Sequence, residues 1–193
     1  MKELIAFIEF SQKFALIERI TLSLGKKRNE NDAEHSFQLA LSAWYLNEKD
    51  SLGLDVSRIA RYALVHDLVE AYAGDTIPSY GAVTEERNTK RDREAAALAR
   101  IRKEFPEASE LWKWIVAYEA KEDPESNFVY ALDKILPIIN IYLNDGAEFE
   151  AWKVTLAMLI REKEHKVKAF PAIEKYFWEL VDLLRASGKI REK

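Results

Sequence analysis

The sequence predicts an all-α protein that folds as a single domain of about seven to eight helices over residues 1–193. Apolar residues recur at helical spacing almost from end to end. Gly (6) and Pro (5) are scarce and charged residues make up 32% of the chain, a composition typical of long amphipathic helices. The 48% of hydrophobic residues suffices for one buried core, and the length fits one domain.

The first two helices are separated by a polar stretch. The opening residues carry one apolar stripe, which Gly25 ends. Asp32 is expected to cap the second helix, because a side-chain acceptor there satisfies free backbone N–H groups. We expect the inner side of this second helix to hold four apolar residues: Phe37, Leu41, Trp44 and Tyr45.

A third helix is expected to begin at Asp55 or Ser57 and to continue through the apolar run at residues 59–69. The longest irregular stretch of the chain follows this helix. It is marked by Gly74, Pro78 and Gly81.

Further helices are predicted in the second half of the chain. Thr84 is expected to cap one of them. Another begins at Asp123-Pro124, because Pro at the first helical position behind an Asp cap is a clear start signal. Pro137 is expected to kink that helix rather than end it, and Gly188 to end the last one.

Composition also argues against several classes of protein. A net charge of −4 argues against a nucleic-acid-binding surface, and the absence of Cys excludes disulfides and thiolate metal sites. No apolar run is long enough to span a membrane. Glu3, Glu9 and Glu18 interrupt the first apolar segment, which argues against a signal peptide. We therefore expect a cytoplasmic protein with no membrane or nucleic-acid partner.

The most informative residues are ionisable groups inside apolar runs. His66 and Asp67 lie in the middle of such a run, where an unpaired charge costs several kcal/mol on burial, so the pair needs a partner such as a metal ion. Glu70 shares a helical face with both residues, and Asp75 follows just beyond. Four ionisable groups within ten residues predict a functional site.

Two further residues fit the same chemistry. His35 lies at the start of the second helix, and Asp133 lies inside another apolar stripe. Imidazole and carboxylate groups suit divalent metals such as Mn, Fe, Co, Ni or Zn. Each residue alone has a simpler explanation, because His35 could be a hydrogen-bonded core residue and Asp133 the ion-pair partner of Lys134.

Together these residues resemble the H…HD…D signature of the HD-domain superfamily, and specifically its 5′-nucleotidase-like branch. The resemblance covers roughly residues 10–140. It rests on three segments: Ala33-Glu34-His35-Ser36, the HDLVEAYAGD stretch from His66 to Asp75, and Ala131-Leu132-Asp133-Lys134.

The resemblance implies an all-α homodimer with one divalent metal cation per chain. It assigns the metal to His35, His66, Asp67 and Asp133, and implies that Glu70 and Asp75 are catalytic. For substrate binding it points to three residues: Arg19 as the phosphate-binding group, Arg28 as a recurrent Arg of this branch, and Pro78 in the loop expected to form a rim over the substrate.

The expected reaction is metal-dependent hydrolysis of a (deoxy)nucleoside 5′-monophosphate to nucleoside and phosphate. We expect Arg19 to be essential for this reaction, and Lys90 and Arg91 to matter little. Four alternatives remain: a deoxynucleoside triphosphate triphosphohydrolase, a phosphodiesterase, a non-catalytic metal- or nucleotide-binding regulator, and a purely structural helical bundle.

The aromatic content bears on assembly. Several large aromatic residues of the second half are difficult to place in one core, although core positions are the simpler explanation. With the resemblance, they predict a homodimer through the later helices, with each active site inside one subunit. These residues are Trp112, Trp114, Trp152, Phe177 and Trp178.

Overall fold

The computed structural model describes residues 1–25, 27–75 and 85–193, with residues 85–88 described by their backbone alone. Eight helices in this part of the chain have ten or more residues, so the predicted helical fold class is confirmed. They are α1 (Lys2–Ala15), α2 (Asp32–Lys49), α3 (Val56–Val65), α5 (Glu85–Glu104), α6 (Ser109–Ala120), α7 (Pro124–Leu143), α9 (Leu156–Val167) and α10 (Pro171–Ser187).

Shorter elements complete the fold. Two helical segments, α4 (Glu70–Ala73) and α8 (Ala147–Ala151), span about one turn each. Strands β1 (Glu18–Leu22) and β2 (Asn29–Asn31) pair in antiparallel orientation, so the protein is mostly rather than entirely α-helical. The sequence analysis missed this hairpin, although β-branched Ile20 and Thr21 favour a strand.

The helix caps follow most of the sequence signals. Asp55 caps α3 and Asp123 caps α7, as predicted, and α7 continues through Pro137. The predicted cap of α2 is wrong by one residue. Asn31 accepts from the backbone N–H of Glu34, and the Glu34 side chain accepts from that of Asn31. The predicted cap at Thr84 lies outside the described residues.

Helix α2 presents the opposite face to the one predicted. Phe37, Leu41, Trp44 and Tyr45 are between 50% and 68% exposed. The buried face instead carries His35, Ser36, Leu39, Ala43 and Asn47. Both faces of α2 contain apolar residues, and contacts with α3 and α7 decide which one is buried.

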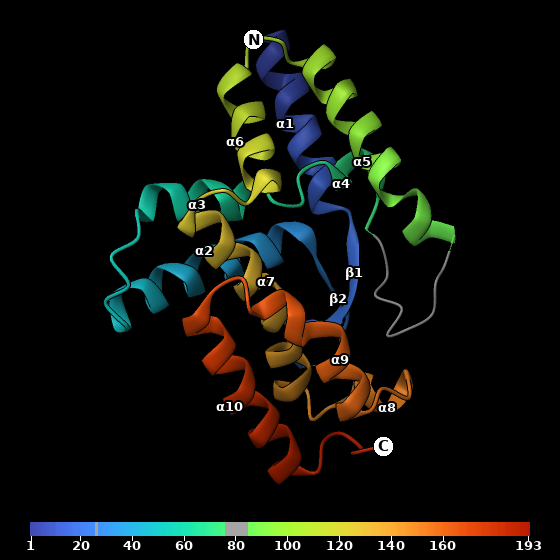
Figure 1. Cartoon of the computed structure of the whole chain (residues 1–193). Helices are drawn as coiled ribbons and strands as arrows, with labels where there is room; N and C mark the ends of the chain where they lie inside the picture. Colours follow the sequence, from blue (N-terminus) through green and yellow to red (C-terminus); the bar gives the residue numbers. More distant parts are fainter. Residues whose placement is uncertain (26, 76–84) are drawn as a thin grey trace.

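The helices pack around two apolar clusters (Figure 1). The larger cluster joins α2, α3, α6, α7, α9 and α10 and includes Tyr62, Phe128 and Phe177. The smaller one joins α1, α5 and α6 to the segment after α3, and includes Phe10 and Phe105. The segment after α3 therefore lies where the clusters meet. None of the described helices combines the length and the apolar character that a membrane span needs.

Candidate active site

The central motif lies on a tight turn and not on a continuous helix. Helix α3 ends at Val65, and the backbone N–H of Glu70 donates to the carbonyl of Asp67 at 2.8 Å, a three-residue spacing. The helix predicted to run to Val69 thus stops four residues early. The turn still brings His66 and Asp67 into one cluster of possible ligands, and it places Asp67 and Glu70 in the lining of one pocket.

Four of the predicted residues meet in one buried cluster. His35 comes from α2, His66 and Asp67 from the turn after α3, and Asp133 from α7. One ligand atom from each lies within 4.8 Å of the others, and His35 Nε2 is 2.9 Å from Asp133 Oδ1. Two helices and a turn, distant from one another in sequence, therefore bring together the four groups expected to bind a metal.

The hydrogen bonds of the two imidazole rings fit a cation in this cluster. His66 donates from Nδ1 to the carbonyl of Ala63 at 2.9 Å, which fixes the orientation of the ring and directs Nε2 into the cluster. That Nε2 atom is buried and has no hydrogen bond of good geometry, although Asp67 Oδ2 is 2.9 Å away. His35 Nδ1 lies 3.6 Å from Glu30 Oε2, and its Nε2 atom lies on the side of Asp133. A cation bound in the cluster could therefore contact Nε2 of both rings. Two His and two Asp are a suitable donor set for a divalent transition metal.

The two aspartates of the cluster favour their ionised form. Burial alone would raise the pKa of Asp67, but the nearby His66 and Arg19 outweigh it and the pKa is lowered. For Asp133 the same penalty is outweighed by Lys134, His35 and His66, and its pKa is also lowered. Both carboxylates are therefore available as anionic ligands.

Glu70 lies beside the cluster, and its pKa is shifted in the opposite direction from those of Asp67 and Asp133. It is 2% exposed, and burial together with the charges of Asp67, Asp75 and Asp32 raises its pKa to about 11. Its Oε2 atom is buried without a hydrogen bond in the described part of the protein. Oxygen atoms of Asp32, Asp67 and Glu70 also lie within 4.8 Å of one another. A cation among these crowded carboxylates would stabilise their ionised forms.

Arg19 reaches the site from strand β1 rather than from the end of the first helix. Its Nη1 atom donates to Asp67 Oδ2 at 2.9 Å and to Asp32 Oδ1 at 3.0 Å. Asp32 is fully buried, and this burial raises its pKa to about 6 although Arg19 lowers it. Arg19 thus links Asp67 to the buried carboxylate of Asp32, a residue that was predicted only to cap a helix.

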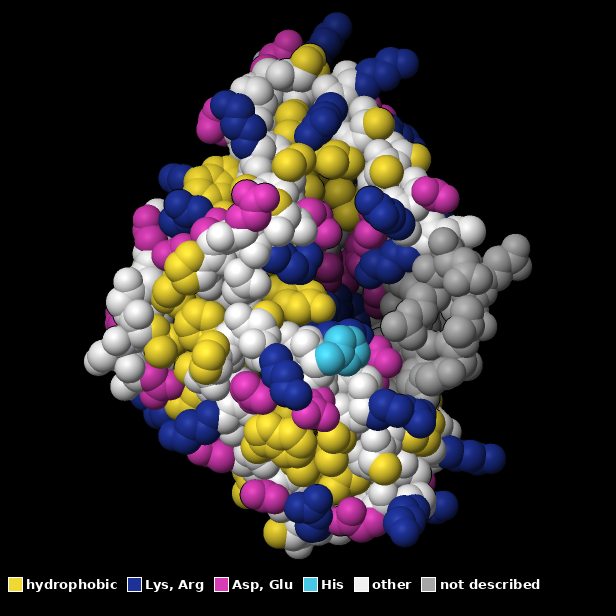
Figure 2. All heavy atoms as spheres, viewed as in Figure 1, with side chains coloured by type: hydrophobic (Ala, Val, Ile, Leu, Met, Phe, Trp, Pro, Cys, Tyr) yellow, Lys and Arg dark blue, Asp and Glu magenta, His cyan; other side chains and the backbone are white. Residues whose placement is uncertain are grey.

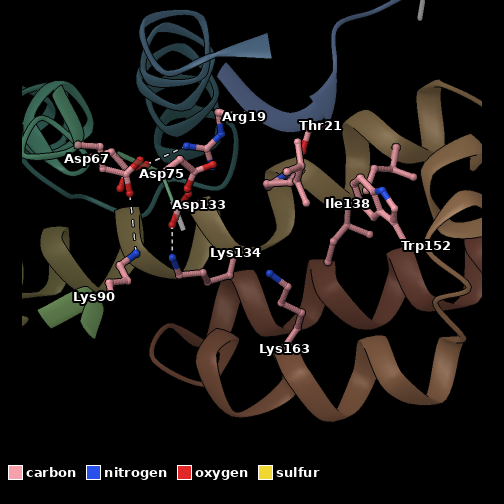
Figure 3. A pocket seen from close by; sticks show the side chains of 14 residues that line it. Arg19, Thr21, Asp67, Asp75, Lys90, Asp133, Lys134, Ile138, Trp152 and Lys163 are labelled. Carbon is pink, nitrogen blue, oxygen red and sulfur yellow. Dashed lines mark hydrogen bonds and ion pairs between the residues drawn. The ribbon is translucent and has the colours of Figure 1, made fainter. Parts of the chain in front are cut away.

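These groups line a pocket that opens on one face of the molecule. Figure 2 shows a hollow near the centre of that face, bordered by acidic and basic side chains. Figure 3 shows Asp67, Asp75, Asp133 and Arg19 at one end of it. Charged residues of the lining are Arg19, Asp67, Glu70, Asp75, Lys90, Asp133, Lys134 and Lys163.

Of the two other predicted substrate-binding residues, only Arg28 lies within the described part of the chain. The exposed Arg28 guanidinium forms an ion pair with Glu34, which already accepts from the start of α2, and it does not line the pocket. Pro78 and most of the predicted rim, which was expected to run from Gly74 to Ala82, lie outside the described residues. Of the pair expected to matter little, Lys90 lines the pocket, with Nζ 3.8 Å from Glu70 Oε1, whereas Arg91 does not line it.

Sequence reasoning also missed Glu30, Asp32, Lys134 and Lys163 as site residues. Lys134 had a usable signal, because it follows Asp133 in an apolar stripe. Lys163 stands in the charged stretch Arg161-Glu162-Lys163-Glu164, which is typical of an exposed face. Only the packing of α9 against α7 buries it.

Two relatives that are similar to this chain in sequence are 5′-deoxynucleotidases. The human 5′-deoxynucleotidase HDDC2 is 34% identical over 110 residues, which are 56% of this chain and 51% of that protein. The 5′-deoxynucleotidase hdd1 of Schizosaccharomyces pombe is 25% identical over 124 residues, 61% of this chain and 60% of that protein. The chain thus spans about half the length of the human relative.

A solved structure is similar over almost the whole chain. It is a predicted metal-dependent phosphohydrolase from Magnetospirillum magnetotacticum MS-1, with a TM-score of 0.83 and 30% identity, covering 98% of this chain and 95% of that one. The PH0347 protein of Pyrococcus horikoshii shares the fold at 23% identity and a TM-score of 0.62. The HD-domain family model matches residues 14–174, a range that contains all four residues of the buried His–Asp cluster, and the chain therefore belongs to the HD-domain family.

Proposed function

We propose that the protein is a metal-dependent phosphohydrolase that converts a (deoxy)nucleoside 5′-monophosphate to nucleoside and phosphate. The buried cluster of His35, His66, Asp67 and Asp133 supports metal dependence, because its donor set suits one divalent cation. The similarity to two 5′-deoxynucleotidases supports the substrate class.

The charge of the pocket favours a monophosphate over a triphosphate. Among the described residues, four cationic and four carboxylate side chains line it, so their formal charges cancel. One bound divalent cation would leave an excess of about two positive charges, which matches the charge of a phosphate monoester at neutral pH. A leaving triphosphate needs about four positive charges, which the described part of the lining does not supply. This balance is the observation that carries our choice of substrate.

Each residue of the site then has a chemical role. When bound, the cation lowers the pKa of a water molecule and polarises a phosphate oxygen. Glu70, in contact with the pocket, orients the attacking water and accepts its proton. Asp75, also in the lining, donates a proton to the departing 5′ oxygen. Arg19 contacts the phosphate through a guanidinium that can form two parallel hydrogen bonds.

A phosphate-release screen tests this proposal. The purified protein is incubated with nucleoside mono-, di- and triphosphates and with Mn, Co, Fe, Ni, Zn or Mg, and orthophosphate and triphosphate are both measured. We expect orthophosphate from 5′-monophosphates, and only with a divalent metal. Faster release of triphosphate would establish the triphosphohydrolase alternative, and no release under any condition would indicate a non-catalytic regulator.

We also propose that the protein forms a homodimer, with the exposed face of α2 as the interface. Phe37, Leu41 and Tyr45 lie beside grooves between α2, α7 and α10 that also expose Leu143 and Leu183. Such a contiguous apolar surface is unusual on a monomer. The aromatic residues on which the dimer prediction was based belong largely to the core, since Trp112 and Phe177 are buried.

A further inference from the structure

The pocket has a second end that the proposed chemistry does not use. Figure 3 shows Trp152 and Ile138 at the end opposite Asp67 and Lys90. This end is formed by β1, by α7, by α9 and by the residue after α8. Its lining is apolar except for Thr21 and Lys163, and comprises Ile20, Thr21, Pro137, Ile138, Ile141, Trp152 and Lys163.

Lys163 is unusual among the cations of the pocket because it lacks an anionic partner. Arg19, Lys90 and Lys134 each form an ion pair with a carboxylate, whereas Lys163 has no hydrogen bond or ion pair within the described residues. Its side chain is almost fully buried, and Figure 3 shows its ammonium group directed into the pocket between Lys134 and Ile138. The group is therefore directed at space that a ligand can occupy.

This position is energetically unfavourable for a lysine without a ligand. Burial and the positive charges of Lys134 and Lys166 lower the pKa of Lys163 to about 7, despite opposing contributions from Asp133 and Glu162. An apolar residue of similar length would avoid this penalty. A hydrogen-bond acceptor brought into the pocket would stabilise the ammonium group.

The position of this end relative to the carboxylates indicates what kind of group it accepts. A nucleotide with its phosphate beside Asp67 and Asp133 must place its base away from them, along the pocket. Apolar and aromatic walls with a small number of polar groups are typical of sites that bind a small organic ligand. The half-buried Trp152 can stack on such a ring, and Lys163 is a donor available to its edge.

We propose that the end of the pocket formed by Ile138, Ile141, Trp152 and Lys163 binds the nucleobase, with Trp152 against the ring face and Lys163 donating to a ring nitrogen or carbonyl oxygen. This inference rests on the proposed hydrolysis of nucleoside monophosphates. It makes Lys163 a specificity-determining residue that distinguishes nucleotides from phosphate esters without a base.

Kinetics with and without a base test the assignment. We compare wild type with Lys163→Met, which keeps the length of the side chain, on deoxynucleoside 5′-monophosphates and on deoxyribose 5-phosphate. The ratio of kcat/KM for nucleotide to that for deoxyribose 5-phosphate should fall by at least about tenfold in Lys163→Met, as loss of a hydrogen bond from a charged group predicts. The exposed Lys168, paired with Glu164 at the end of the same helix, gives the matched control Lys168→Met, which should keep the ratio.

Two outcomes would overturn the assignment. If kcat/KM of Lys163→Met falls equally for the nucleotide and for deoxyribose 5-phosphate, Lys163 binds the phosphate. If kcat/KM falls for neither substrate, Lys163 does not contact the substrate. Nucleoside binding provides a readout without turnover: thymidine or deoxyguanosine should quench tryptophan fluorescence in wild type, and less in Trp152→Phe. If the enzyme hydrolyses no nucleotide, the proposed function fails while this titration still tests the base site, and absence of any quenching would refute it.

Discussion

Arg19 and Asp67 form a contact that connects strand β1 to the turn after α3 at the edge of the pocket. Arg19 Nη1 lies 2.9 Å from Asp67 Oδ2, and the same nitrogen donates to the fully buried Asp32 at 3.0 Å. One guanidinium therefore stabilises two carboxylates at the edge of the pocket, and a substrate phosphate would approach a cation whose position is already fixed. Substitution of Arg19 must affect both substrate binding and folding.

Arg19→Ala should lower kcat/KM for nucleoside monophosphates by about 100-fold, the usual cost of losing a donor to a charged transition state. It should also destabilise the fold, because Asp32 loses its partner. The double variant Arg19→Ala with Asp32→Asn separates these effects in denaturant unfolding and kinetics. It should recover stability and not activity; recovery of both would show that Arg19 has only a structural role.

Glu70→Gln should reduce kcat by about 100-fold or more while the metal content stays the same, since the amide keeps the shape of the side chain but cannot accept a proton. Metal analysis and steady-state kinetics on one preparation measure both quantities. Loss of the metal in this variant would make Glu70 a ligand and would contradict the role proposed for it.

Lys163 should make stability depend on pH. Its pKa of about 7 in the fold lies below the ordinary value of 10.5, so between these limits the unfolded chain binds the extra proton and stability rises with pH. Lys163→Met should therefore be more stable than wild type by a few kcal/mol at pH 7, and this difference should shrink toward pH 10. Urea unfolding at several pH values measures it. If the difference in stability between Lys163→Met and wild type does not change with pH, Lys163 remains protonated in the folded protein over the whole pH range.

The sequence predicted that these residues come together because charged residues inside apolar runs require a partner, and His66, Asp67 and Asp133 all satisfy that condition. The buried face of a helix and the exact end of a helix were less predictable from the sequence. Helix α2 has apolar residues on both sides, so the choice between Leu39 and Leu41 as the buried residue depends on the position of α7. Lys163 could not be recognised, since its burial arises from contacts distant in sequence.

Light scattering should show a dimer at micromolar concentration. Leu41→Glu places a charge in the exposed apolar face of α2 and should give a monomer. Leu4→Glu, at an exposed position on α1, is the control and should remain a dimer. A wild-type monomer would contradict the proposed homodimer, and a dimer that survives Leu41→Glu would place the interface elsewhere.

His35, His66, Asp67 and Asp133 are proposed to hold one divalent cation on which hydrolysis depends. Metal analysis of Asp67→Ala beside wild type tests it most directly, with the exposed Asp182→Ala as control. We predict close to one divalent ion per chain in wild type and Asp182→Ala, and loss of both metal and activity in Asp67→Ala and His66→Ala. Full metal content in Asp67→Ala would contradict the account.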